Sequence, residues 1–229
     1  MTRRTRCKSA VVFAPLFTAL VLVPPAVGVV LHPGETVPLA GTTSAIRPDI
    51  GEPVVDTRDA AFGFDWNGTP VTGTVSQRVR GFQPGGLLVD YRISAFDDHG
   101  LGMRIESLTT QGYFPYMVPY LDADFRLDEA GVVSPTSASA ANDSGVTVRF
   151  DFGSGPLLAG ETSRWMFVGD PSNDLYEFGN WGAQVLVRAP DGTGVSAPFQ
   201  SYSTYIPAPA SASAFALGLL PLVARRRRS

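Results

Sequence analysis

The sequence predicts an all-β protein, an antiparallel β-sandwich or jelly roll, on three observations. Glycine and proline are abundant, with 24 and 19 residues in a chain of 229, and both interrupt helices and mark turns. Apolar and polar residues alternate over several short segments, as they do in half-buried strands. Clusters of turn-forming residues separate these segments at intervals of roughly 10 to 20 residues, with no convincing amphipathic helix between them.

The alternation is clearest in segment 88–96. There the apolar Val89 and Tyr91 alternate with the polar Asp90 and Arg92, so that one face of the strand is expected to be buried. The same period recurs in four further segments: 101–106, 146–152, 165–167 and 183–187.

Two other stretches give a different prediction. From Val29 to about Gln77 the chain is rich in Pro, Gly, Thr and Asp and carries only short apolar patches, so that the alternation becomes plain only after Gln77. Segment 133–145 is rich in Ser and Ala and is expected to be a loop.

The charge of the chain is distributed unevenly along its length. Eight of the 18 Lys and Arg residues lie in two terminal clusters, whereas all 21 acidic residues lie between them, so the body carries ten basic residues against 21 acidic ones. A body with a net charge of about −11 is repelled by phosphate backbones, which argues against nucleic acid as a partner.

Residues 1–28 have the form of an export signal peptide. A basic start is followed by an apolar run over residues 10–23 and by two prolines. The small residues Ala26 and Gly28 suit the −3 and −1 positions of a signal-peptidase site, so cleavage is expected after Gly28. The alternative is a retained membrane anchor or a core helix, for which the apolar run is short.

The single cysteine, Cys7, lies inside this expected signal. After cleavage the chain would have no disulfide, no thiolate ligand for a metal and no cysteine nucleophile. Its stability outside the cell would then depend on the core, which a domain of this size can supply.

Residues 206–229 have the composition of a sorting or anchoring segment. Two prolines precede a spacer of small residues, an apolar stretch and a terminal block of arginines. Under the positive-inside rule the arginines stay cytoplasmic while the body lies outside, and the stretch is expected to form a hydrophobic helix. The residues expected to act in sorting are Pro207, Ala208, Pro209, Arg225, Arg226, Arg227 and Arg228.

This order of parts resembles the PEP-CTERM sorting signals of bacterial exported proteins, with Ala208 in place of the usual glutamate. The resemblance covers about 24 residues. It implies an exported protein of the cell envelope, surface or extracellular space, with transient or permanent C-terminal anchoring. The implied partners are the export machinery, signal peptidase and an exosortase-type processing enzyme. The alternative is a simple C-terminal membrane anchor.

The body is similar to uncharacterised domains that are often attached to such tails. The similarity rests on four segments: Val75–Val79, Gly86–Tyr91, Val146–Phe152 and Leu158–Ser163. It implies a β-sandwich and an exported location, and it supplies no catalytic residues. The expected organisation is a signal peptide over 1–28, a β-sandwich domain over 29–205 and a sorting segment over 206–229.

No catalytic motif is apparent in the sequence, and no catalytic residue is predicted. His99 lies in a turn beside Asp97 and Asp98, where it is either a base or metal ligand, or an exposed turn histidine. The densest acidic group lacks the glycine and the ligand spacing of an EF-hand loop, so no cofactor or metal site is predicted, with calcium left open. That group consists of Asp122, Asp124, Asp128 and Glu129.

Exposed aromatic rings would point to carbohydrate binding. Trp165 alternates with strand residues and is expected in the core, whereas Trp181 lies on a glycine-flanked turn beside Asn180. A ring presented there can stack on a sugar while the amide bonds its hydroxyl groups, so Trp181 and Asn180 are the candidate glycan contacts. The sequence thus predicts a non-enzymatic exported protein of structural or adhesive type. The alternatives are a secreted module that binds extracellular polysaccharide and a secreted hydrolase.

Overall fold

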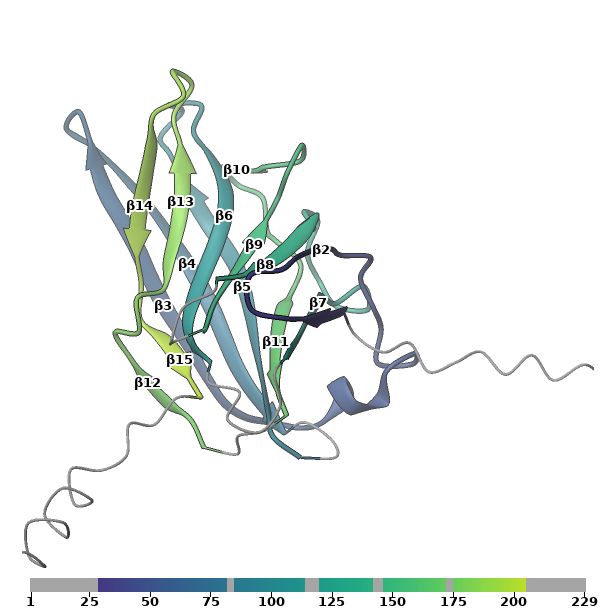
Figure 1. Ribbon diagram of the computed structural model, residues 1–229. Helices are drawn as coiled ribbons and strands as arrows, with labels where there is room; N and C mark the ends of the chain where they lie inside the picture. The colour runs from purple at the N-terminus through teal and green to yellow at the C-terminus, as the bar shows by residue number, and fades with distance from the viewer. Residues whose placement is uncertain (1–28, 82–84, 114–119, 142–145, 172–174, 205–229) are drawn as a thin grey trace, which may run out of the picture.

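The structure, a computed structural model, describes residues 29–81, 85–113, 120–141, 146–171 and 175–204 (Figure 1). These residues are nearly all β, and their one helical element is a short 3-10 helix, η1 (Pro48–Gly51). The prediction of an all-β protein with antiparallel sheets is therefore confirmed. Within the described ranges, no helix has the length and hydropathy needed to cross a bilayer. The signal and tail helices predicted for 1–28 and 206–229 fall outside the described residues.

Six strands form the first sheet, and every neighbouring pair in it is antiparallel. In order across the sheet the strands are β1 (Val29–Leu31), β7 (Leu121–Phe125), β11 (Met166–Asp170), β5 (Leu87–Asp97), β4 (Thr69–Gly81) and β3 (Val54–Trp66).

The second sheet has seven strands and is also antiparallel. Its order is β14 (Gly194–Pro198), β13 (Gln184–Arg188), β6 (Arg104–Tyr113), β9 (Val146–Asp151), β8 (Ser137–Ala140) and β2 (Thr36–Pro38), with β10 (Leu157–Leu158) paired to β6. A third, two-stranded sheet joins β12 (Glu177–Gly179) to β15 (Ser201–Ser203).

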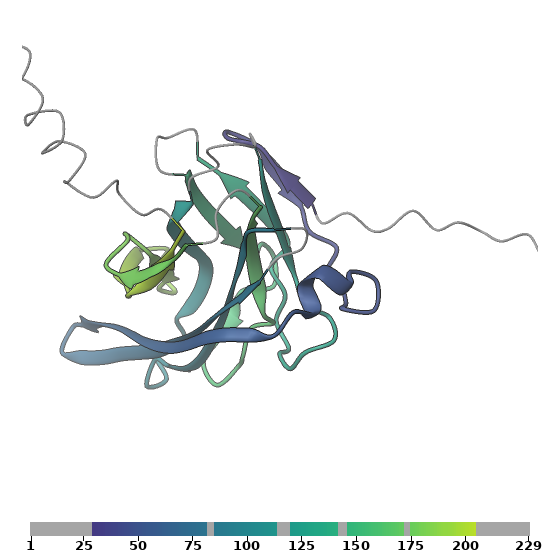
Figure 2. The same ribbon diagram turned by 90° about the horizontal axis from the view of Figure 1, so that it is seen from below.

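One buried apolar cluster draws side chains from both large sheets. Val75 and Tyr91 of the first sheet and Leu108, Phe150 and Val185 of the second are all fully buried in it. Burial of such side chains stabilises a domain by roughly 1.5–3 kcal/mol each, before the loss of chain entropy is counted. In both views the β13–β14 hairpin of the second sheet faces strands β3 and β4 of the first sheet (Figures 1 and 2).

The longest hairpin of the described chain lies in a region that the alternation pattern left without strands. β3 and β4 pair from Trp66↔Thr69 down to Val54↔Arg80, joined by Asn67 and Gly68. Both turn residues have positive φ, 52° and 84°, as a type I′ turn requires. Asn-Gly between two strands is a strong hairpin signal, so the turn is encoded locally even where the alternation of apolar and polar residues is weak.

Two smaller differences concern strand boundaries. The prediction of a loop over 133–145 is wrong over β8, because Ala138 and Ala140 are buried and small enough to fit beside their neighbours in the sheet. In segment 101–106 the strand begins only at Arg104, after a turn closed by a hydrogen bond from the Met103 amide to Asp98.

Candidate functional site

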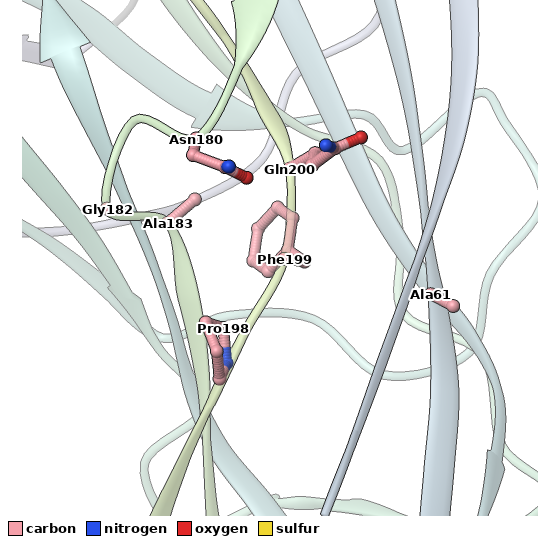
Figure 3. Close-up of a pocket in the computed structure, with 7 residues that line it drawn as sticks. All are labelled: Ala61, Asn180, Gly182, Ala183, Pro198, Phe199 and Gln200. Carbon is pink, nitrogen blue, oxygen red and sulfur yellow. The ribbon is translucent and has the colours of Figure 1, made fainter.

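A pocket of about 540 Å³ opens between β3 and the residues that flank the β13–β14 hairpin (Figure 3). Its volume lies in the range of small-ligand sites. The residues that line it are Ala61, Asn180, Gly182, Ala183, Pro198, Phe199 and Gln200.

The hairpin brings the two lips of this pocket together. Gln184 pairs with Pro198 at the end of the hairpin farthest from its turn. Just beyond this pair, the Phe199 amide donates a hydrogen bond to the Ala183 carbonyl at 3.0 Å. As a result the turn that contains Asn180 lies beside Phe199, while β3 supplies the opposite wall (Figure 3).

The lining is uncharged and offers two carboxamides. Asn180 and Gln200 are exposed, and neither side chain is hydrogen-bonded to any described residue. The ring of Phe199, with 6% of its surface exposed, lies between them (Figure 3). Each carboxamide can donate and accept hydrogen bonds, so the pocket can serve a ligand whose groups also do both.

The backbone of the pocket is fixed by contacts from neighbouring strands. The Gln200 carbonyl accepts a hydrogen bond from Gln77 Nε2 at 2.7 Å. Gly182 has φ +76°, and a Cβ there would lie 2.2 Å from Gln111 Oε1, so only glycine fits this turn. These contacts fix the backbone near Asn180 and Gln200, while the carboxamide side chains of both residues have no hydrogen-bond partner among the described residues.

The structure separates the two residues predicted to contact a glycan. Asn180 lines the pocket, whereas the half-buried Trp181 does not. The Trp181 Nε1 atom is buried without a hydrogen-bond partner among the described residues and lies beside Gly179. The structure instead brings Asn180 together with Gln200 and Phe199, which sequence reasoning missed. Only the register of the hairpin places them together, and no local sequence signal records that register.

A second polar feature lies on the outer face of the six-stranded sheet, where a buried carboxylate is held by arginines. Asp90 is fully buried and paired with both Arg78 and Arg80, the latter at 2.9 Å. Glu129 joins both guanidinium groups, at 2.6 Å from Arg78 and 3.4 Å from Arg80. The Arg78 guanidinium also lies 3.8 Å from the centre of the Trp165 ring. Trp165 is thus buried as expected, although it lies against arginines on the outer face and not in the apolar cluster between the two large sheets.

The same face is covered by segment 42–52, which polar contacts hold in place. Arg47 donates to Asp122 at 3.1 Å, and Ser44 Oγ donates to Asp128 at 2.6 Å. Arg126 donates to the Ile50 carbonyl at 2.8 Å. The Ile50 side chain packs in a small buried cluster with Leu88 and Phe167. Segment 42–52 is therefore a fixed cover over part of the sheet.

The four acids for which calcium was left open all face donors of the protein itself. Asp122, Asp128 and Glu129 face arginines, and Asp124 accepts from the amides of Gly41 and Phe125 at 3.0 and 2.9 Å. The Arg126 hydrogen bond lowers the pKa of Asp128, whereas burial raises the pKa of Asp122. Across the described residues, no group of three or more His, Cys, Asp or Glu side chains is placed to hold a metal.

The remaining candidates are placed as follows. His99 is an exposed turn residue with positive φ, its Nδ1 3.6 Å from an Asp97 oxygen. The predicted cleavage residues, Ala26 and Gly28, fall outside the described residues, as do all seven residues of the predicted sorting motif from Pro207 to Arg228.

Comparison of the chain with protein-family models, curated proteins and solved structures yields no significant match in any of the three.

Proposed function

We propose that this is an exported protein of the cell envelope or extracellular matrix, of structural or adhesive type, sorted through residues 206–229. In this proposal the two antiparallel sheets form a β-sandwich or jelly roll that stands outside the cell. Signal peptidase removes residues 1–28, and an exosortase-type enzyme acts on the tail.

The observation that carries the proposal is the way the body holds β15, the strand that leads into the tail. Ser201, Tyr202, Ser203 and Thr204 are all fully buried. Ser203 Oγ donates to the Gly112 carbonyl at 2.7 Å, and Thr204 Oγ1 donates to Asp170 at 2.7 Å.

The inner face of the six-stranded sheet contributes a further contact. Gln77 is fully buried, donates to the Gln200 carbonyl at 2.7 Å and accepts from the Tyr202 amide at 3.3 Å. A body joined to an anchor through its C-terminus needs its last strand fixed in the fold. The contacts of β15 meet that need.

The N-terminal side of the body supports the same organisation. The described strand β1, Val29–Leu31, lies after the predicted cleavage residue Gly28 and pairs with β7 from Val29↔Ala123 to Leu31↔Leu121. Cleavage there would leave the β1–β7 pairing intact.

Mass spectrometry of the protein recovered from its native source tests the proposal directly. We expect an N-terminus at Val29, a processed C-terminus and recovery in the envelope or extracellular fraction. An intact Met1, an N-terminus upstream of Pro24 or a cytosolic protein would contradict it.

A variant series separates the role of the tail from that of the body. Replacing Arg225–Arg228 by glutamine should reduce retention at the envelope, because the positive-inside stop would be lost. The matched control replaces Arg104 and Arg149, two arginines that are about half exposed on the body, and should leave retention unchanged. Equal retention of both variants would contradict sorting through the tail.

A second candidate function is carbohydrate binding, which the uncharged pocket with its two carboxamides favours. It is compatible with an adhesive role, because a body held at the surface by its tail could contact extracellular polysaccharide through this pocket.

A further inference from the structure

We infer that the pocket between β3 and the β13–β14 hairpin binds one unit of an uncharged saccharide chain, with Asn180 and Gln200 as its hydrogen-bonding groups. The inference rests on the proposed carbohydrate-binding role and names its site and ligand class. It differs from the sequence-based expectation, in which Trp181 was the main contact.

The first argument is the match between the polar groups. A sugar hydroxyl both donates and accepts a hydrogen bond, as does a carboxamide, so the two pair in either direction. Asn180 and Gln200 are both exposed and lack partners among the described residues. They can therefore bind hydroxyl groups without first breaking bonds within the protein.

The second argument concerns the apolar part of the lining. Phe199, Pro198 and Ala183 give the pocket carbon surfaces between the two amides. A pyranose ring presents C–H groups on its faces and hydroxyl groups around its rim. A site with apolar walls and a few placed polar groups suits that pattern.

The third argument concerns charge and selects a neutral ligand over an acidic one. None of the seven lining residues is ionisable. Farther along β3, Arg58 lies 3.8 Å from Asp56 and is thereby paired with a carboxylate. The body carries ten basic residues against 21 acidic ones, so an anionic saccharide would meet an unfavourable field.

The pocket is also accessible to a chain. Asn180, Pro198 and Gln200 are exposed at its rim, and Ala61 lies on β3, the outermost strand of its sheet. A polysaccharide can therefore enter from the side without opening the fold.

The test uses the protein purified after export and affinity electrophoresis through gels containing a neutral polysaccharide. Dextran, a soluble cellulose derivative without charge and a soluble β-1,3-glucan are the neutral probes, and alginate is the acidic comparator. We expect retardation by at least one neutral probe and weaker or no retardation by alginate. Thermal melting of each variant is measured alongside.

Asn180→Ala and Gln200→Ala should each weaken retardation by about 3- to 10-fold, the loss expected for one hydrogen bond. The matched control is Gln184→Ala, which removes a half-buried carboxamide of β13 that does not line the pocket. Gln184→Ala should bind the polysaccharide as the unmodified protein does. Asn180→Ala and Gln200→Ala should keep the melting temperature of the unmodified protein, because these two side chains have no partners within the described fold.

Two outcomes would overturn the inference, and they are distinguishable. Retardation that persists unchanged in both pocket variants would place saccharide binding elsewhere, with the carbohydrate-binding function intact. Retardation by none of the neutral probes would remove both the site and that function, while the location of the protein is decided separately by fractionation.

Discussion

Two neighbouring residues, Asn180 and Trp181, illustrate how strongly the environment determines the role of a side chain. Both lie in one glycine-flanked turn, yet Asn180 faces the pocket and Trp181 does not line it. Residue type and turn context sufficed to single out the pair from the sequence. Which of the two lines the pocket depends on how the turn meets β14, and a single segment of sequence does not carry that information.

We expect Trp181→Ala to lower stability and to leave saccharide retention nearly unchanged. The ring is half-buried and lies against Gly179, so its removal costs packing, up to about 3 kcal/mol. Urea denaturation and affinity electrophoresis on the same variant check this. A large loss of retention with unchanged stability would restore Trp181 as the main glycan contact.

A second prediction at this scale concerns Gly73 of β4. A Cβ at Gly73 would lie 2.2 Å from the ring of Phe62, the residue paired with it on β3, and that ring is buried. Gly73→Ala should therefore destabilise the protein by about 1–3 kcal/mol in chemical denaturation.

Gly81, at the end of the same strand, provides the matched control. A Cβ there would have no atom within 4 Å, so Gly81→Ala should change stability by less than about 0.5 kcal/mol. Combining Gly73→Ala with Phe62→Leu should cost less than the sum of the single changes, because the smaller side chain makes room for the methyl group. Additive costs would show that the ring does not cause the strain.

At the scale of elements, we expect the contacts that hold the cover formed by segment 42–52 to weaken at low pH. The pKa of Asp128 is lowered below its ordinary value of 3.8, first by the Arg126 hydrogen bond and also by those from Ser44. A lowered carboxylate pKa stabilises the fold above the unfolded value, and this contribution is lost as the pH falls.

Asp128→Asn should accordingly cost about 1–2 kcal/mol at pH 7, and the difference from the unmodified protein should shrink between about pH 5 and pH 2. Denaturation curves at several pH values measure it. Asp59→Asn, a change of an exposed carboxylate on β3, is the control and should have little effect. A difference that grows on acidification would contradict the sign.

The second element is β15, whose attachment depends on Gln77. Gln77→Leu leaves the Gln200 carbonyl and the Tyr202 amide without their partner and should cost about 1–3 kcal/mol. Hydrogen exchange of the Tyr202 amide should accelerate more than that of amides in β6. Gln184→Leu on β13 serves as control. Equal exchange in both variants would show that Gln77 does not hold the strand.

The strands differ in how far the sequence predicts them, for physical reasons. β5 places Val89, Tyr91 and Ile93 on its core-facing side and the polar Asp90, Arg92 and Ser94 on the other, so the alternation is clean and its limits, Leu87–Asp97, match the expected 88–96 closely. In β3 the alternating pattern is obscured over the first half of the strand, because this exposed edge strand carries Asp56, Arg58 and Asp59 there, and its apolar alternation is limited to the short patch from Phe62 to Trp66. β8 was missed because buried alanines look like loop residues when only composition is considered.

The molecule as a whole is expected to be β-rich and monomeric and insensitive to reductant after export. The only cysteine lies within the predicted signal, and the outermost strand β3 carries charges that discourage edge-to-edge pairing. A far-ultraviolet spectrum, size exclusion and melting with and without reductant check these three properties. A helix-dominated spectrum or a reductant-dependent melting temperature would contradict them.

The attachment of β15 also determines how the exported body would respond to mechanical force on its tail. The bonds that hold this strand follow one another along the chain, from Thr204 with Asp170 to Ser203 with Gly112 and then Tyr202 with Gln77. Tension applied beyond Thr204 and directed across β15 would load these bonds one after another, as in unzipping. The body would therefore yield in small steps from its anchored end and absorb a pull gradually, while the two large sheets stay folded.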